Sequence, residues 1–381
     1  MKRKIILDQE TNNFLISGYK MESHNRQYII LGLTPQGLAI LRELGRAGVN
    51  VTAFCTSKHN IGFHSRYGKK LCYQNIAELK LLIREIVANA PEKPICYVTS
   101  GETLAAVLCG YKELWDECEV LSGPYATVET LAHKDRMYEY ATEQGFKVAR
   151  YATLDKTEVA DLCYPIFLKR NYEIPMFFKA IKIDSQEVFN NYFSKITETE
   201  RPHILAQEFI DIPKEHLLEI SSQGFFCNGD SKGFLITNQK RRLKKGITSY
   251  IEELNASELK ERILYLCKTF MQNLDYTGFA EFEFMFNTRT KELFFIEVNT
   301  RTCGLQSSMG HKFSNIKDVL LNPHNAPELI EKTKHLHWMN IQRDIRARFE
   351  KKDFSNLSDI FKSKFDILDI KDLKPFFCQF L

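Results

Sequence analysis

Short apolar runs alternate with amphipathic helical patterns at the start of the chain. Residues 27–32 form an apolar run that ends in glycine, a helical stripe follows at Leu38, Leu41 and Leu44, and 49–54 is a second apolar run. A strand, a turn, a helix and a second strand in this order predict the opening of a doubly wound parallel sheet.

The alternation continues as far as a Gly-Pro step at 123–124. We predict helices over 76–89 and 102–115, and strands over 94–100 and 119–121. Strands that alternate with helices favour an α/β, Rossmann-like domain, and the Gly-Pro step marks its end.

Beyond this step the pattern changes to one helix over 126–144, capped by Gly145, and then to longer strands and hairpins. The predicted strands cover 147–154, 165–170, 177–183, 203–210, 216–228, 233–243, 278–287 and 292–301. One further helix is predicted over 257–274. Runs of antiparallel strands with few helices are typical of an α+β region.

These changes of pattern divide the chain into five parts. We predict an arm over 1–25, the Rossmann-like domain over 26–124, two lobes over 125–205 and 206–330, and a C-terminal extension over 331–381. Two to three compact domains suit a chain of 381 residues.

Composition narrows the class of protein. The chain is 44% hydrophobic and 26% charged, and its 52 basic and 48 acidic residues leave a net charge of +4, too little to predict binding to nucleic acid or to an anionic membrane. No apolar stretch reaches the length of a membrane span, and the first residues lack the apolar core of a secretory leader. The ten cysteines include no CxxC pair, so we expect reduced thiols and a cytoplasmic protein.

Polar side chains occupy alternate positions in both strands of the hairpin 278–301. They are Glu281 and Glu283 on the first strand and Glu297, Asn299 and Arg301 on the return strand. A turn of three or five residues centred near Thr290 would bring both sets to one face of the sheet.

Carboxylates gathered in an apolar sheet repel one another, and two arrangements remove that repulsion. A divalent cation can lie between them, and ligands that are all oxygens favour Mg²⁺. Alternatively the glutamates lie on a solvated face, which is the more common arrangement for a strand pair. The neighbouring Phe-Met-Phe and Phe-Phe-Ile segments indicate that these strands are buried on at least one side.

Lysines form a second pattern. Lys169 ends a strongly apolar strand, Lys134 lies in the first helix of the α+β region, and Lys179 and Lys182 follow on the next strand. Each alone is typical of a surface lysine, but with the carboxylate hairpin they indicate a site for nucleotide phosphates. The basic run 240–245 is either a solvated face or a further contact for an acidic substrate or phosphate.

At these residues the chain resembles the ATP-grasp superfamily, on the branch of D-aspartate ligase and the carbamoyl phosphate synthase large chain. The resemblance covers about 27–310, and its most specific motif is Ile296-Glu-Val-Asn-Thr-Arg301, the family's glutamate-x-asparagine-x-arginine strand. It implies a pre-ATP-grasp domain over 26–124, followed by a two-lobed ATP-grasp domain with its small lobe over 125–205 and its metal-binding large lobe over 206–330.

The resemblance also implies roles for individual residues. The magnesium ligands would be Glu283, Glu297 and Asn299. The groups around the transferred phosphate would be Arg301, Lys134 and Lys169. Lys179 is a further candidate for the ATP phosphates, and Glu281, on the same strand face, could support the metal shell or steer the amine. The segment Gln207, Glu208, Phe209 and Ile210 would be the adenine hinge, with Glu208 or Glu215 on adenine or ribose, although spacing alone favours an ordinary strand end there.

The segment 170–179 departs from the family pattern because it contains no glycine, where the family has a glycine-rich loop over the phosphates. Either this loop is stiff or Lys179 takes over its contacts. In the first domain, Gly32-Leu-Thr-Pro-Gln-Gly37 lacks the middle glycine of the dinucleotide fingerprint, so it is weak evidence for NAD.

The resemblance implies an ATP-dependent carboxylate–amine ligase that uses Mg²⁺, or Mn²⁺ in its place, and proceeds through an acyl phosphate. Its partners would be a small carboxylate, an amino acid among the candidates, and an amine, and a homodimer is open to it. Two alternatives remain: a degenerate ATP-grasp protein that binds nucleotide without ligation, and a dinucleotide-dependent oxidoreductase.

Overall fold

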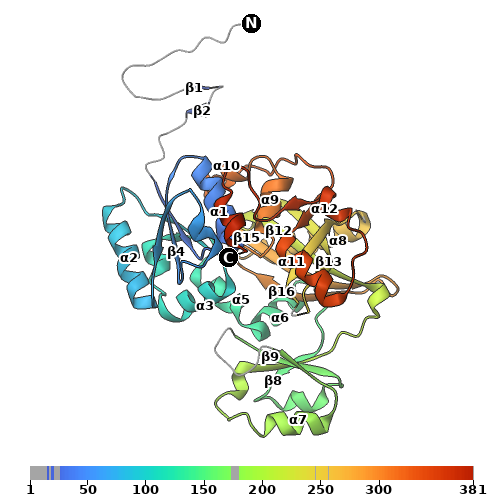
Figure 1. Ribbon diagram of the computed structural model, residues 1–381. Helices are drawn as coiled ribbons and strands as arrows, with labels where there is room; N and C mark the ends of the chain where they lie inside the picture. The colour runs from blue at the N-terminus through green and yellow to red at the C-terminus, as the bar shows by residue number, and fades with distance from the viewer. Residues whose placement is uncertain are drawn as a thin grey trace.

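The computed structural model describes residues 15–16, 19–20, 26–172, 180–244, 246–255 and 257–380. Three larger sheets organise these residues: a parallel one near the N-terminus, a small antiparallel one, and a large, mostly antiparallel one (Figure 1). The mixed α/β and α+β class predicted from the sequence is confirmed. Within the described residues, no helix is long and apolar enough to cross a bilayer.

The N-terminal sheet has the order β5-β4-β3-β6-β7, and all its strands are parallel. Its strands are β3 (Gln27–Leu31), β4 (Asn50–Cys55), β5 (Lys69–Cys72), β6 (Ile95–Val98) and β7 (Glu119–Val120). Its helices are α1 (Pro35–Arg46), α2 (Ile76–Asn89), α3 (Gly101–Gly110) and α4 (Leu114–Glu117). Because strand order reverses between β3 and β6, the helices that follow these two strands diverge at one edge, where ligands bind in such sheets.

The predicted helix 126–144 is wrong as a single element, because the structure breaks it at His133. It forms α5 (Tyr125–Ala132) and α6 (Lys134–Glu143), with His133 extended between them. Asn171, at the end of a distant strand, takes the first donors of α6: its carbonyl accepts from the Lys134 N–H at 2.8 Å and its side-chain oxygen accepts from the Asp135 N–H at 2.9 Å. Lys134 therefore starts a helix and does not lie within one.

The small lobe is a four-stranded antiparallel sheet of order β10-β9-β11-β8, with one helix (Figure 1). Its elements are β8 (Tyr151–Thr153), β9 (Ile166–Arg170), β10 (Ala180–Ile183), α7 (Gln186–Phe193) and β11 (Ile204–Glu208). Its core contains Leu168, Ile183 and Phe189. Most of the glycine-free segment, residues 173–179 with Lys179, lies outside the described residues.

The large lobe carries a seven-stranded sheet of order β16-β15-β12-β13-β14-β17-β18. Its strands are β12 (Leu217–Cys227), β13 (Asp230–Arg242), β14 (Thr248–Glu253), β15 (Gly278–Asn287), β16 (Leu293–Asn299), β17 (His337–Met339) and β18 (Lys364–Phe365). The helices are α8 (Ser257–Met271), α9 (Gln306–Lys312), α10 (Ile316–Leu321), α11 (Ile341–Lys351), α12 (Asp359–Lys362) and α13 (Lys374–Cys378). The sequence patterns predicted no element beyond about residue 325, yet β17 and β18 extend this sheet.

Candidate functional site

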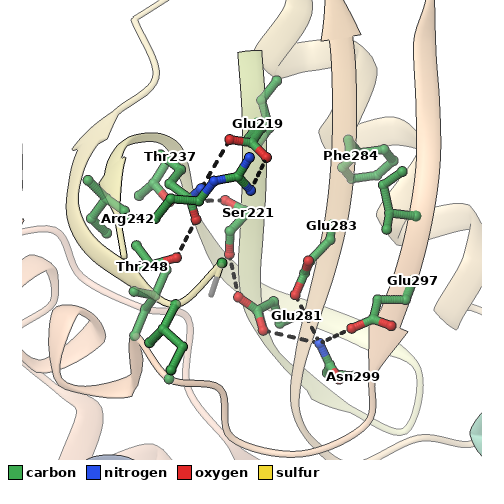
Figure 2. A pocket seen from close by; sticks show the side chains of 18 of the residues that line it. Glu219, Ser221, Thr237, Arg242, Thr248, Glu281, Glu283, Phe284, Glu297 and Asn299 are labelled. Atoms are coloured by element: carbon green, nitrogen blue, oxygen red, sulfur yellow. Dashed lines mark hydrogen bonds and ion pairs between the residues drawn. The ribbon is translucent and has the colours of Figure 1, made fainter. Parts of the chain in front are cut away.

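The hairpin of β15 and β16 brings the predicted acidic residues together. Glu281 pairs with Asn299 across the two strands, and Glu283 pairs with Glu297. The Asn299 amide nitrogen lies 3.3 Å from a carboxylate oxygen of Glu281 and of Glu283, and 3.4 Å from one of Glu297 (Figure 2). Three carboxylates and an amide therefore converge on one face of the sheet, as the alternation predicts.

The turn and the strand register that bring these side chains together differ from the predicted ones. Phe286 pairs with Leu293 and the turn occupies 288–291, so its four residues are an even number and not three or five. An even turn alone would leave Glu297 on the opposite face from Glu283. A bulge corrects this, because β16 advances two residues, from Glu297 to Phe295, where β15 advances one. Phe295 then packs in the aromatic core while Glu297 faces the site.

Charge is distributed unevenly among the three glutamates. Burial raises the pKa of Glu281, and burial together with the neighbouring Glu297 and Glu281 raises the pKa of Glu283 well above its usual value. By contrast, the Lys134 ammonium lies 2.6 Å from a Glu297 oxygen and lowers the pKa of that carboxyl to about 2. No basic nitrogen of the described residues lies within 4 Å of Glu281 or Glu283, so these two have little compensating positive charge.

The second predicted lysine lies in a buried polar cluster between the lobes. The Lys169 ammonium donates to the Tyr138 hydroxyl at 2.7 Å and to the Gln207 side-chain oxygen at 2.6 Å. Burial, reinforced by the positive charge of Lys134, lowers the pKa of Lys169 to about 7. A bound phosphate would stabilise its protonated form.

Arg301 joins the carboxylate face to the N-terminal domain. Its guanidinium donates to the Asn299 side-chain oxygen at 2.9 Å and to the Thr302 carbonyl at 3.0 Å. A methyl group added at Gly101, the first residue of α3, would lie 3.2 Å from the same guanidinium. The carboxyl edge of the parallel sheet therefore reaches the arginine at the rim of the carboxylate cluster.

The predicted hinge residues are used in different ways. Gln207 turns inward to Lys169, while the Glu208 carboxylate pairs with Arg150. The N–H groups of Glu208 and Phe209 bond to carbonyls within the small lobe, whereas the Ile210 N–H has no hydrogen bond to a described residue. Glu208, Phe209 and Ile210 line a cavity of about 300 Å³ between the lobes.

One predicted residue of the described chain, Glu215, is not part of this arrangement. Glu215 is exposed in the one-turn helix Lys214–His216 and lines neither this cavity nor the larger one described below. Lys179 lies outside the described residues.

The donor set suits Mg²⁺ in its chemistry. No group of three or more His, Cys, Asp or Glu side chains in the described part of the chain is already arranged to hold a metal ion. Magnesium, however, needs only one or two protein carboxylates, because it keeps water and substrate phosphates as its other ligands. Glu283 and Glu297 supply the carboxylates. The Asn299 amide nitrogen faces the glutamates and its oxygen faces Arg301. A rotation of the amide by half a turn would exchange the two atoms, and Asn299 would then supply an oxygen to the metal.

The acidic face is one end of a cavity of about 570 Å³ that the sequence did not predict. Its lining adds polar and charged residues from β12, β13, the N-terminal domain and α11: Glu219, Ser221, Gln239, Arg242, Gln36, Glu102 and Arg343. Figure 2 shows Glu219, Ser221 and Arg242 beside the acidic face. The Ser221 hydroxyl donates to Glu281 at 2.6 Å. Polar residues at alternate positions of β12 were the available sequence signal, but alternation alone cannot say which sheet face lies inside.

Two neighbouring arginines of the basic run 240–245 have different surroundings. Arg241 turns away from the cavity to pair with Asp344 at 2.6 Å, with only 10% of its side chain exposed. Arg242 lines the cavity and pairs with Glu219 at 2.5 Å. One residue of the run thus stabilises the C-terminal segment, and its neighbour belongs to the candidate site.

No protein-family model and no curated protein matches the sequence, but solved structures resemble it. An ADP complex of N5-carboxyaminoimidazole ribonucleotide synthetase superposes with a TM-score of 0.68 and 12% identity, over 86% of this chain and 85% of that chain. L-amino acid ligase from Bacillus licheniformis gives 0.60 and 16%, over 80% of this chain and 75% of that chain.

A third similar structure is the biotin carboxylase domain dimer of the Hydrogenobacter thermophilus 2-oxoglutarate carboxylase, with MgADP and bicarbonate. It gives a TM-score of 0.63 and 14% identity, over 83% of this chain and 74% of that chain. At these identities the likeness establishes the fold. The chain therefore has the ATP-grasp fold that its glutamate-x-asparagine-x-arginine strand indicates, with a parallel-sheet domain before it.

Proposed function

We propose that this protein is an ATP-dependent ligase that activates a carboxylate as an acyl phosphate and joins it to an amine. The observation that carries the proposal is the meeting of three carboxylates, one amide and Arg301 at the end of a large cavity. Lys134 contacts the same cluster through Glu297. Phosphoryl transfer requires acidic side chains that hold a divalent cation and basic side chains that stabilise the phosphate charge, and this cluster offers both.

Within this proposal, Glu283, Glu297 and Asn299 would hold Mg²⁺. The bound ion would supply positive charge to the phosphate oxygens. Lys134 and Lys169 would bind those oxygens, and the free N–H of Ile210 would meet the adenine at the cavity between the lobes. Phosphate contacts favour the charged form of Lys169, which burial otherwise disfavours.

Arg301 would orient the acid and stabilise the charge that develops while the γ-phosphoryl group moves from ATP to a carboxylate oxygen. The amine nitrogen then attacks the acyl carbon, the bond from that carbon to the phosphate oxygen breaks, and inorganic phosphate leaves. Glu281, buried beside Ser221, can accept the proton that the amine loses.

Phosphate release in the presence of MgATP, small acids or amino acids, and amines tests this proposal. We expect release that depends on both acid and amine, and Glu297→Gln should abolish it. Glu328→Gln is the matched control, because Glu328 is 75% exposed, pairs with Lys232 at 3.7 Å and lines neither of the two cavities. Activity that survives Glu297→Gln would refute the metal assignment.

Thermal unfolding with ligands separates the competing functions. A ligase and a nucleotide-binding protein without ligase activity are both stabilised by ATP with Mg²⁺, and phosphate release then distinguishes them. Stabilisation by NAD(P)H alone would refute both. A homodimer, a cytoplasmic location and the five-part domain division stay part of the proposal.

A further inference from the structure

The large cavity extends well beyond the reacting groups. From Glu283 on β15 its floor crosses β12 and β13 to Thr248 on β14. Strands lie about 4.8 Å apart, so this floor spans roughly 14 Å. A cavity of about 570 Å³ has room for an acid with a substantial side chain or for two substrates together.

Arg343 lines this cavity from the first turn of α11, the helix that follows β17. Its side chain is half-buried, and among the described residues it has neither an ion pair nor a hydrogen bond. The adjacent Asp344 is already bound by Arg241 at 2.6 Å and by Arg348 at 2.8 Å. Asp344 therefore pairs with Arg241 and Arg348 and not with Arg343.

The second acidic residue near Arg343 is Asp366, whose carboxylate also has other hydrogen-bond partners. Its carboxylate accepts from the Ser307 hydroxyl at 2.7 Å and from the Asn340 amide at 2.9 Å. Asp366 and Arg343 attract each other only across a longer distance, without a contact. The guanidinium of Arg343 is left with its donors available to the cavity.

The other arginines that line the cavity are occupied. Arg242 pairs with Glu219, and Arg301 donates to Asn299 and Thr302. Of the arginines that line this cavity within the described residues, Arg343 is the one whose side chain has no partner. A guanidinium presents a planar set of donors that matches a carboxylate or a phosphate, and partial burial strengthens that contact.

We propose that Arg343 binds an anionic group carried by one of the two substrates within this cavity. The substrate would bear a carboxylate or phosphate in addition to the group that reacts. This inference rests on the ligase function proposed above, and it makes Arg343 a specificity residue.

Matched pairs of small molecules test this inference by calorimetric titration, with Mg²⁺ and a non-hydrolysable ATP analogue present. The pairs are glutamate with glutamine, O-phosphoserine with serine, and succinate with its monomethyl ester, so each neutral member keeps one carboxylate. We expect at least one anionic member to bind tenfold or more tightly than its neutral counterpart. The pair that discriminates identifies the group as a carboxylate or a phosphate.

The matched variants are Arg343→Ala, Arg343→Lys and Arg346→Ala. Arg343→Ala should abolish the discrimination and Arg343→Lys should keep part of it. Arg346→Ala should keep all of it, because Arg346 is exposed on the same helix, pairs only with Glu350 and does not line the cavity.

Two outcomes overturn the inference: no pair discriminates in the unmodified protein, or discrimination survives Arg343→Ala. A separate titration with the ATP analogue and Mg²⁺ tests the proposed function, because Arg343 is not among the residues assigned to ATP. If the unmodified protein does not bind the analogue, the ligase function is refuted. If it binds the analogue but no pair of small molecules discriminates, only the assignment of Arg343 is refuted.

Discussion

Two charged clusters in the large lobe differ in how completely their charges are paired. In the first, Asp344 receives Arg241 at 2.6 Å and Arg348 at 2.8 Å, and Arg241 also reaches Asp359 at 3.4 Å. In the second, Glu281 and Glu283 receive the amide of Asn299 at 3.3 Å but no basic group of the described residues within 4 Å. The charges of the first cluster compensate one another, whereas Glu281 and Glu283 in the second have no ion-pair partner among the described residues.

This difference separates a structural cluster from a candidate catalytic one. The Asp344 side chain is 1% exposed and that of Arg348 is 3% exposed, so each relies on the other for compensation. Burying carboxylates without counter-charges costs stability, and proteins keep that arrangement where a ligand supplies the missing charge. The following predictions test whether the two clusters behave differently.

The largest effect should follow from breaking the complete cluster. Asp344→Ala leaves Arg241 and Arg348 buried with the more distant Asp359 as their shared acidic partner, and we expect the free energy of unfolding to fall by about 3–5 kcal/mol. Urea denaturation measures the change. A loss below about 1 kcal/mol would mean that water already compensates these arginines.

The incomplete cluster should respond in the opposite way. Glu283→Gln removes a carboxyl whose charged form burial and the neighbouring glutamates disfavour, so the unfolding midpoint should stay unchanged or rise. Ligase activity should fall about 100-fold or more, since even groups that support metal ligands are worth 10–100-fold. Added Mg²⁺ should stabilise the unmodified protein and not the variant. A large loss of stability in Glu283→Gln would place this carboxylate with the structural cluster.

A smaller effect concerns the pH dependence of nucleotide binding. The pKa of Lys169 is about 7 because the side chain is buried, and bound phosphate favours its charged form. Binding therefore takes up a proton above pH 7, and affinity for the ATP analogue should fall about tenfold between pH 6 and pH 8. Lys169→Gln should flatten this profile. Lys195→Gln, at an exposed residue of the small lobe that lines neither cavity, should leave it unchanged.

The smallest effect should come from an exposed pair. Lys232 and Glu328 lie 3.7 Å apart with 21% and 75% of their side chains exposed, and solvent screens such pairs. Glu328→Gln should change neither the unfolding midpoint nor the rate of phosphate release, because Glu328 lines neither of the two cavities. A clear effect on either would show that exposure is a poor guide to which charged groups matter here.

Local patterns predicted much of the fold. The helix α2 has the predicted bounds, Ile76–Asn89, and β15 begins and ends at the predicted residues, Gly278–Asn287. These elements are amphipathic or strongly apolar over their whole length, and such periodicity is a local property. The break at His133 was missed because neither glycine nor proline marks it; its cause is Asn171, which is distant in the sequence.

The sequence by itself determined which residue types the hairpin presents. Strand side chains alternate, so Glu281 with Glu283, and Glu297 with Asn299, must each share a face whatever the rest of the chain does. Only the tertiary structure decided that the two pairs meet, because a bulge at Ile296 corrects an even-numbered turn. It also decided which charges remain uncompensated. A local pattern records what a residue can offer, but its partners come from segments as far apart as Lys134 and Glu297, and only packing selects them.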